Sequence, residues 1–368
     1  MPKKISDLVL LIIFSSFLWL PLYGFFIADK KIYSPNEKRT LAQKPEFSSI
    51  KTLDFFVKDY TSYFNDHFGY RERLVGSYNK VLNLLGVSST SKKVIEGKNG
   101  WYFYAGDAVI DQYSTSFTED ELQKWAQHLE QKRQWLEQRG IVYLFVIPPN
   151  SHTIYSEFMP DWFLQTKKES RKDQLLSYLQ KHTKVDVLDL APALLEVKKS
   201  TLVYYKTDTH WNRLGASVAR YEIEKKLHQR IPSISPASYL NDDFIWSPRP
   251  ESGDLAVMLG LDKNIREDAP FFDNPKMQSC DQNIPVQSYG FKFRGLPPQA
   301  TECDGQLKLL IFHDSYAYGL EALALNFKKV VYLWRFADDM KVLEHYVNVE
   351  KPDVVIEERV ERFLSDVP

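Results

Sequence analysis

The stretch KTDTHWNRLGA, residues 206 to 216, holds an aspartate and a histidine two positions apart, Asp208 and His210. Side chains two apart in an extended segment point the same way, so the carboxylate can hold one nitrogen of the imidazole ring. Such a pair orients the ring and stabilises it when it is protonated. A histidine held in this way activates a serine hydroxyl, which is otherwise a poor nucleophile. The alternative interpretation is an ordinary polar loop.

A serine in a suitable setting occurs in LKLLIFHDSYAYGL, residues 307 to 320. The apolar run LKLLIF is typical of a strand buried on both faces, and it leads directly to Asp314 and Ser315. Backbone N–H groups at the start of a following helix can face a developing oxyanion. We therefore predict a triad of nucleophile Ser315, base His210 and orienting Asp208. The alternatives are a helix cap at Asp314–Ser315 and His313 as the base.

Alternating helical and strand patterns predict the scaffold for these residues. Thr118 and Glu121 form a capping box that opens a helix, and Gly140 ends it. Further helices are expected at 173–182, 213–230 and 317–327, and strands at 141–147, 185–190, 307–312, 329–334 and 352–358. This alternation predicts an α/β fold with a mostly parallel central sheet covered by helices on both faces. Ligands bind beyond the carboxyl ends of such strands, here residues 148–152, 313–317 and 334–339.

The N-terminus predicts a membrane segment. Lys3 and Lys4 precede an uncharged run from Leu8 to Ala28, and about 20 apolar helical residues span a bilayer. Lysines before the span favour a cytoplasmic N-terminus with the rest of the chain outside. We expect an uncleaved signal anchor. A cleaved signal peptide is the alternative, although PLYGFFIADKK stays bulky up to Ala28 and contains no clear cleavage signal.

The segment after the anchor is expected to be a stalk. Residues 30 to 50 are polar and contain Pro35 and Pro45, and the stretch from Thr52 to Leu85 has helical spacing of apolar residues with a break near Gly69. The residues DHFGYRER at this break are interpreted as an ion pair or cap at the junction. A strand–turn–strand hairpin is expected for VIEGKNGWYFY, residues 94 to 104.

Charge and cysteine content restrict the class of protein. The chain has 47 basic and 48 acidic residues, so nothing suggests binding to nucleic acid. The two cysteines, Cys280 and Cys303, lie in a chain that is expected to be exported, where a disulfide would stabilise by about 3 kcal/mol. Two free thiols are the alternative. No CxxC, HExxH or EF-hand pattern occurs, so we expect neither a metal site nor a cofactor.

With these features the chain resembles the SGNH-hydrolase-like alginate O-acetyltransferases. The segments that carry the resemblance are VIEGKNGWYFY, VIPPNSHTIYSEFMP, YYKTDTHWNRLGA, SGDLAVML, HDSYA and VVIEERVERFL, between about residues 35 and 365. The resemblance implies Ser315, His210 and Asp208 as the catalytic residues. The Asp-His block precedes the serine block here, as it does in this family. His313 departs from the glycine that SGNH serine blocks usually carry before Asp-Ser.

The resemblance also implies organisation, partners and function. It implies a membrane anchor (1–30), a stalk and helical segment (31–90) and an SGNH-like three-layer catalytic domain (91–368), as in the single-domain, membrane-anchored branch. The implied reaction passes acetyl groups from a membrane-bound O-acyltransferase, through an acetyl-serine, to a polysaccharide in the periplasm beside the inner membrane. An acetyl esterase with the same triad and a non-catalytic scaffold in polysaccharide assembly are the alternatives.

A last group of residues is assigned to the oxyanion or to the substrate. Asn150 is a candidate side-chain donor to the oxyanion, and Arg335 follows a strand at the same sheet edge. Trp211, Tyr316 and Trp334 are candidates for stacking on sugar rings, with core packing as the alternative.

Overall fold

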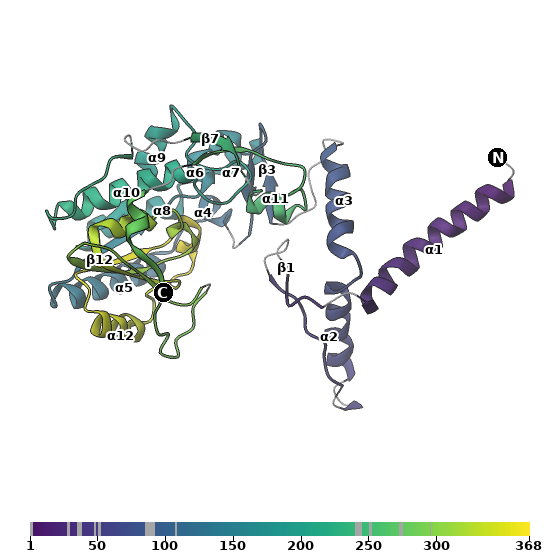
Figure 1. The fold of residues 1–368 in the computed structure, drawn as a ribbon, viewed down its shortest axis with the longest axis horizontal. Helices are drawn as coiled ribbons and strands as arrows, with labels where there is room; N and C mark the ends of the chain where they lie inside the picture. Colours follow the sequence, from purple (N-terminus) through teal and green to yellow (C-terminus); the bar gives the residue numbers. More distant parts are fainter. Residues whose placement is uncertain are drawn as a thin grey trace. The chain divides into compact units, whose positions relative to one another are not determined.

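The chain forms two compact units in this computed structural model (Figure 1). One comprises Met1–Val94 with Glu251–Arg266, and the other comprises Ile95–Pro250 with Glu267–Pro368. The structure describes residues 3–27, 30–34, 39–47, 49–50, 53–84, 93–106, 109–239, 245–249, 252–271, 275–294 and 296–368. Of the segment ends named above, Ala28, Thr52 and Leu85 lie outside these residues, as does Pro35. The domain limits at residues 30 and 90 stay a prediction.

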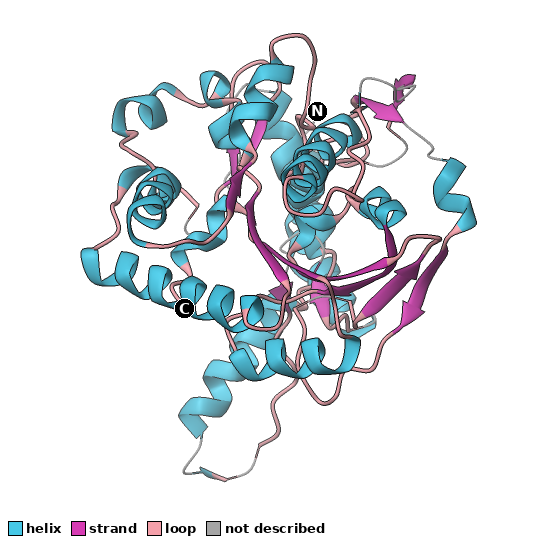
Figure 2. Cartoon of the chain, turned by 90° about the vertical axis from the view of Figure 1, so that its left-hand side faces the viewer, coloured by secondary structure: helices cyan, strands magenta, loops and turns pink. Residues whose placement is uncertain are grey.

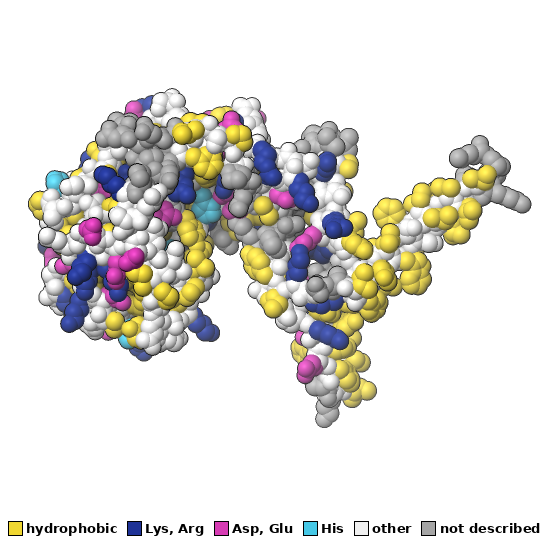
Figure 3. All heavy atoms as spheres, in the orientation of Figure 1, with side chains coloured by type: hydrophobic (Ala, Val, Ile, Leu, Met, Phe, Trp, Pro, Cys, Tyr) yellow, Lys and Arg dark blue, Asp and Glu magenta, His cyan; other side chains and the backbone are white. Residues whose placement is uncertain are grey.

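The first unit is mostly helical. Its helices are α1 (Lys3–Ile27), α2 (Leu53–Asp66), α3 (Arg71–Leu84) and α11 (Asp254–Met258), and β1 (Tyr33–Ser34) pairs with β2 (Arg39–Thr40). Within α1, the segment Asp7–Ile27 is long and apolar enough to cross a membrane. Figure 3 shows apolar side chains along α1 and along one side of α2.

A close contact joins α1 to the break between α2 and α3. A Cβ atom on Gly69 would lie 2.2 Å from the carbonyl oxygen of Pro21, so only glycine fits there. The ring of Phe25 packs against Tyr63 and Phe64 of α2. Beside the break, His67 Nε2 lies 2.9 Å from the Ala42 carbonyl oxygen. These contacts tie the end of the apolar helix to α2.

The second unit is built on a seven-stranded sheet with the order β6-β5-β13-β11-β12-β10-β9 (Figure 2). The first five strands are parallel, and β10 and β9 continue the sheet antiparallel. The bounds are β5 (Val142–Ile147), β6 (Val187–Asp189), β9 (Asp281–Pro285), β10 (Gln299–Glu302), β11 (Leu307–Phe312), β12 (Phe327–Leu333) and β13 (Val354–Glu358). The mostly parallel sheet was predicted from the sequence, whereas β9 and β10 were not.

Helices cover both faces of this sheet. One face packs against α5 (Glu119–Glu137), α8 (Arg171–His182) and α12 (Met340–Glu350), and the other against α6 (Ser151–Ile154), α9 (Ala191–Lys198) and α10 (Arg213–His228). Alternate residues of β11 point to opposite faces, so Leu310 and Phe312 join the first core and Leu309 and Ile311 the second. This double burial explains the unbroken apolar runs in the sequence.

The remaining elements are short. They are β3 (Val94–Glu96) with β4 (Tyr102–Tyr104), β7 (Ile245–Pro248) with β8 (Asp268–Phe271), α4 (Asp111–Ser114), α7 (Asp161–Thr166) and the 3₁₀ helices η2 (Ser156–Phe158), η4 (Pro275–Ser279), η5 (Ser315–Ala317), η6 (Glu321–Asn326) and η7 (Glu361–Ser365). The expected helix over 317–327 is wrong, because η5 and η6 are separate 3₁₀ helices. Gly319, with φ +96°, lies between them in a conformation that favours glycine.

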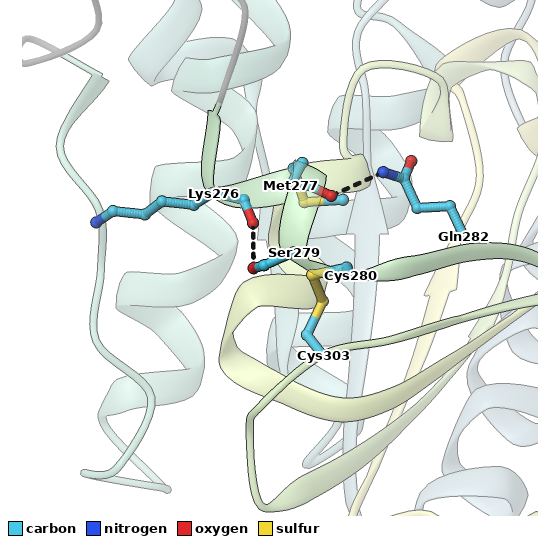
Figure 4. Close-up of a disulfide and its surroundings, with 6 residues drawn as sticks. All are labelled: Lys276, Met277, Ser279, Cys280, Gln282 and Cys303. Carbon is cyan, nitrogen blue, oxygen red and sulfur yellow. Dashed lines mark hydrogen bonds between the residues drawn. A yellow bond between two sulfur atoms is a disulfide. The ribbon is translucent and has the colours of Figure 1, made fainter.

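The edge of the sheet is covalently closed. Cys280 and Cys303 form a disulfide that joins the residue before β9 to the residue after β10 (Figure 4). Beside it, Gln282 Nε2 donates to the Met277 carbonyl oxygen at 2.8 Å, which holds the start of β9 against η4. The turn-rich segment between the cysteines is thereby fixed at its base.

Candidate active site

The loop that holds Asp208 and His210 is fixed at both ends. A β-bridge joins Tyr204 to Trp211, so the residues between them form a tight excursion. The carboxylate of Glu267 accepts hydrogen bonds from the backbone of Lys206 (2.7 Å) and Thr207 (3.2 Å). Immediately after the loop, Asn212 caps α10 by accepting from the Gly215 amide at 3.0 Å. The loop is thus held between a bridge, the partly buried carboxylate of Glu267 and a helix start.

Asp208 itself shapes the tip of this loop. Its Oδ1 accepts from the backbone N–H of His210 at 3.1 Å, which is an Asx turn, and lies 2.8 Å from His210 Nδ1. The same short backbone segment therefore fixes the carboxylate and the ring together.

Ser315 follows β11 on a turn that Asp314 organises. The Asp314 side chain accepts from the Tyr316 amide at 2.9 Å and from the Val360 amide, just beyond β13, at 2.8 Å. Its own backbone N–H donates to Glu358 Oε2 at 3.0 Å. The turn with the serine is therefore fixed to the end of the neighbouring strand. Because η5 has only three residues, it has no helix N-terminus of the kind expected from the sequence.

The two segments meet in one hydrogen-bonded series. His210 Nε2 lies 2.8 Å from Ser315 Oγ, and His210 Nδ1 lies 2.8 Å from Asp208 Oδ1. The side chain of Asp208 is buried, whereas that of His210 is 26% exposed and Ser315 is half-buried. Ser315 therefore keeps part of its surface exposed, while the Asp208 carboxylate is shielded. This geometry suits a serine that a histidine deprotonates and a carboxylate orients.

An arginine that the sequence did not suggest completes the series. Arg249 Nη1 lies 2.9 Å from Asp208 Oδ2, and its guanidinium lies over the Tyr205 ring at 4.0 Å. Burial alone would raise the pKa of Asp208, but the hydrogen bond with His210 and the charge of Arg249 lower it well below its usual value. The carboxylate therefore stays ionised despite its burial.

A second acidic group lies beneath the serine turn. Glu358 is fully buried, and burial together with the negative charge of Asp314 raises its pKa well above the usual value. Glu358 is therefore held as a neutral acid beside the Asp314 carboxylate. The sequence signal for it was VVIEERVER, in which charged residues directly follow an apolar strand.

Two of the residues proposed for sugar stacking have their rings inside the protein. Tyr316 is 0% exposed and Trp211 is 3% exposed, and the two rings pack edge to face at 5.0 Å. The Tyr316 hydroxyl donates to the Thr209 carbonyl at 2.5 Å, and the Tyr316 ring lies 5.2 Å from that of His210. Neither ring is open to a sugar. The two rings instead support the loop of Asp208 and His210.

Asn150 and Arg335 form hydrogen bonds with other residues. Asn150 is buried after β5, where its Nδ2 donates to the Tyr113 hydroxyl at 3.2 Å. Arg335 donates from Nη1 to the Lys292 carbonyl at 3.1 Å. Neither forms a hydrogen bond with Ser315 or His210 among the described residues. The alternative base, His313, is bonded through Nδ1 to the Asp314 carbonyl oxygen at 2.7 Å.

Trp334, the third candidate for stacking, is partly exposed. Its ring lies 5.3 Å from that of Tyr318 and 6.1 Å from that of His313. Within the described part of the second unit alone, no three His, Cys, Asp or Glu side chains lie close enough together to hold a metal ion.

Comparisons with known proteins identify the fold and the family of the chain. A solved structure of PatB1 from Bacillus cereus has the same fold, with a TM-score of 0.54 and 15% identity, covering 74% of this chain and 96% of that one. A protein of Pseudomonas putida named probable alginate O-acetylase AlgJ is 22% identical over 223 residues, 55% of each chain. One of the same name from Pseudomonas syringae pv. tomato is 28% identical over 155 residues, 40% of this chain and 38% of that one.

The chain thus matches about half, or less, of the length of these relatives. A family model described as the SGNH hydrolase-like domain of the acetyltransferase AlgX matches residues 94–282, just over half of the chain. The matched region includes Asp208 and His210 and ends before Ser315. The chain therefore belongs to the AlgJ/AlgX-like family of SGNH hydrolase-like O-acetyltransferases.

Proposed function

We propose that this protein is an exported polysaccharide O-acetyltransferase that works through an acetyl-serine on Ser315. The observation that carries the proposal is the series of hydrogen bonds from Asp208 through His210 to Ser315, at the carboxyl edge of a parallel sheet. Membership of an acetyltransferase family supports the choice of acetyl as the group transferred.

In the first half-reaction, Ser315 Oγ attacks the carbonyl carbon of the acetyl donor while His210 Nε2 takes the hydroxyl proton. The Ser315 amide, at the start of η5, is the proposed donor to the oxyanion, and such a donor contributes about 3 kcal/mol. The bond between the acetyl group and its carrier then breaks, and His210 returns the proton to the leaving group. Asp208, kept ionised by Arg249, stabilises the imidazolium in between.

In the second half-reaction, a sugar hydroxyl attacks the acetyl-serine and gives its proton to His210. The ester bond to Ser315 breaks, and the proton passes from His210 to Ser315 Oγ. The products are an O-acetylated sugar and the free enzyme. Water in place of the sugar would give an esterase, so the function depends on a bound acceptor.

The first unit supports a location at a membrane. We propose that α1 is an uncleaved anchor in the inner membrane and that the second unit lies in the periplasm, where the polymer is exported. Because acetyl-CoA is absent there, the proposed donor partner is a membrane-bound O-acyltransferase. The anchor would keep the enzyme beside that partner.

The decisive experiment traps the acetyl-enzyme. Purified protein mixed with p-nitrophenyl acetate should gain one acetyl group by intact mass, and peptide mapping should place it on Ser315. Ser315→Ala should gain none. An acetyl group elsewhere, or an unchanged rate of ester cleavage in Ser315→Ala, would contradict the proposal. In cells, full polymer acetylation by Ser315→Ala would favour a scaffold.

A further inference from the structure

A cavity of about 160 Å³ opens beside the serine turn. His313 and Ala317 line it, and they lie two residues on either side of Ser315 in the chain. The opposite wall comes from β9 and β10, the antiparallel strands that the disulfide closes. The cavity is therefore built from the turn that holds the nucleophile, from the end of β12 and from the edge hairpin.

The lining of this cavity combines aromatic rings with uncharged polar groups. Trp334 and the exposed ring of Tyr318 lie edge to face at one side, and amides and hydroxyls come from Gln299, Thr301 and Tyr332. Flat amphipathic rings beside amide and hydroxyl groups are suited to a sugar, which has apolar C–H faces and polar edges.

One hydroxyl in the lining is buried. The Tyr332 oxygen lies beside the Thr301 side chain, which lines the same cavity. Burial, and then the charge of Glu321, raise the pKa of Tyr332 above its usual value, so the hydroxyl keeps its proton. A ligand hydroxyl would find both a donor and an acceptor in these two side chains.

The charges that line the cavity favour a neutral sugar over an acidic one. Among the described residues that line it there is no lysine or arginine, and the single ionisable carboxylate is Glu321. Two arginines, Arg213 and Arg220, line an adjoining cavity of about 430 Å³ that shares Gln282 and Glu321. A uronate next to Ser315 would lose water from its carboxylate without gaining a cation, and it would face Glu321.

From this lining we propose that the acceptor residue beside Ser315 is a neutral sugar rather than a uronate. The inference rests on the proposed function, since it assigns the acceptor of the acetyl-serine. It narrows the substrate to glycans whose acetylated residue has hydroxyl groups but no carboxylate. An acidic polymer such as a polyuronate is the excluded class.

A matched pair of hexasaccharides tests the proposal on the purified protein. β-1,4-Mannohexaose and β-1,4-hexamannuronate share linkage and configuration and differ only in a hydroxymethyl or carboxylate at C6. With p-nitrophenyl acetate as donor, acetylated product is counted by mass spectrometry, and cellohexaose serves as a second neutral acceptor. We expect at least tenfold more transfer to a neutral hexasaccharide than to hexamannuronate.

Two results would overturn the inference. One is transfer to hexamannuronate at a rate equal to or above that to both neutral acceptors. The other is failure of both neutral acceptors while ester cleavage that depends on Ser315 continues. Failure of the proposed function would give a different result, because Ser315→Ala would then cleave p-nitrophenyl acetate as fast as the parent protein.

Substitutions of residues that line the cavity test whether the cavity determines the acceptor preference. Trp334→Ala should raise the KM for the neutral acceptor about tenfold, and Glu321→Lys should raise transfer to hexamannuronate relative to mannohexaose severalfold at low salt. Trp162 is 47% exposed and lies outside this lining, so Trp162→Ala should leave the acceptor preference unchanged. An unchanged preference in Glu321→Lys would contradict the charge argument.

Discussion

Arg249 is the residue whose role is most specific to this site, because its cation compensates a buried carboxylate next to the base. Asp208→Asn removes the charge that stabilises the imidazolium, and kcat should fall about 10³- to 10⁴-fold. Arg249→Met leaves Asp208 in place without its cation. We expect a smaller loss of about tenfold in kcat, equivalent to about 1.4 kcal/mol. Rates of p-nitrophenyl acetate cleavage measure both.

The control for Arg249 is another arginine in an ion pair. Arg230 contacts Asp186 and its side chain is 64% exposed, so Arg230→Met should have little effect. Arg249→Lys keeps the charge and should recover part of the loss. Equal losses in Arg249→Lys and Arg249→Met would instead indicate that packing against Tyr205 matters more than charge.

The raised pKa of Glu358 predicts that its contribution to the free energy of unfolding falls as the pH rises. A carboxylate that is ionised and paired in the folded chain shows the opposite trend. The folded chain keeps the proton on Glu358 to a higher pH than the unfolded chain, in which a glutamate ionises near pH 4.3. Glu358 therefore weakens folding as the pH rises above about 4. Glu358→Gln removes this penalty, so its free energy of unfolding relative to the parent should rise by about 1–3 kcal/mol from pH 4 to pH 8.

Urea unfolding at the two pH values gives this difference directly. Glu196 has a side chain that is 71% exposed, and Glu196→Gln should show almost no change with pH. A Glu358→Gln variant that differs from the parent by the same amount at both pH values would show that Glu358 is ionised in the folded chain.

At the scale of elements, the start of α10 sets the position of the loop that holds Asp208 and His210. A Cβ atom on Gly215 would lie 2.2 Å from the Val203 carbonyl oxygen and 3.0 Å from the Trp211 Cβ. Gly215→Ala must therefore push the helix away from the Tyr204–Trp211 bridge. We expect a loss of about 1–3 kcal/mol in the free energy of unfolding, as in overpacked cores, together with lower kcat. Ser217→Ala, on the same helix, should be nearly neutral in both assays.

We expect the disulfide of the β9–β10 hairpin to affect stability and acceptor binding more than it affects binding of the acetyl donor. Replacing Cys280 and Cys303 by serine should lower the free energy of unfolding by about 3 kcal/mol. Because this hairpin forms a wall of the proposed acceptor cavity, the KM for mannohexaose should rise more than the KM for p-nitrophenyl acetate. Parallel changes in the two KM values would mean that the hairpin does not contact the acceptor.

Elements with local signals could be predicted from the sequence, and those with long-range causes could not. Neighbouring residues define the capping box of Thr118 and Glu121, and they also define the apolar run before Ser315. Arg249 reaches Asp208 across 41 positions of sequence, so no local pattern identifies it. The sequence left Trp211 and Tyr316 open between sugar stacking and core packing, because aromatic composition does not say which rings the tertiary packing buries.

For the molecule as a whole, the proposed anchor would decide where the proposed chemistry takes place. Helix α1 stays apolar up to Ile27, and Phe25 near its end packs against Tyr63 and Phe64, which argues against removal of the segment. We expect the mature protein to keep residues 3–27 and to stay in the membrane after alkaline carbonate extraction. Deleting residues 1–27 should release it.

Protease added to the outside of spheroplasts should degrade the second unit, because lysines before an apolar span favour a cytoplasmic N-terminus. A smaller, soluble mature chain would instead identify Lys3–Ile27 as a cleaved signal peptide. Polymer acetylation in cells then separates two roles for α1. If the anchor serves only export, a cleavable signal in its place should preserve acetylation. If it keeps the enzyme beside a membrane-bound donor, acetylation should fall even though Ser315 still cleaves p-nitrophenyl acetate.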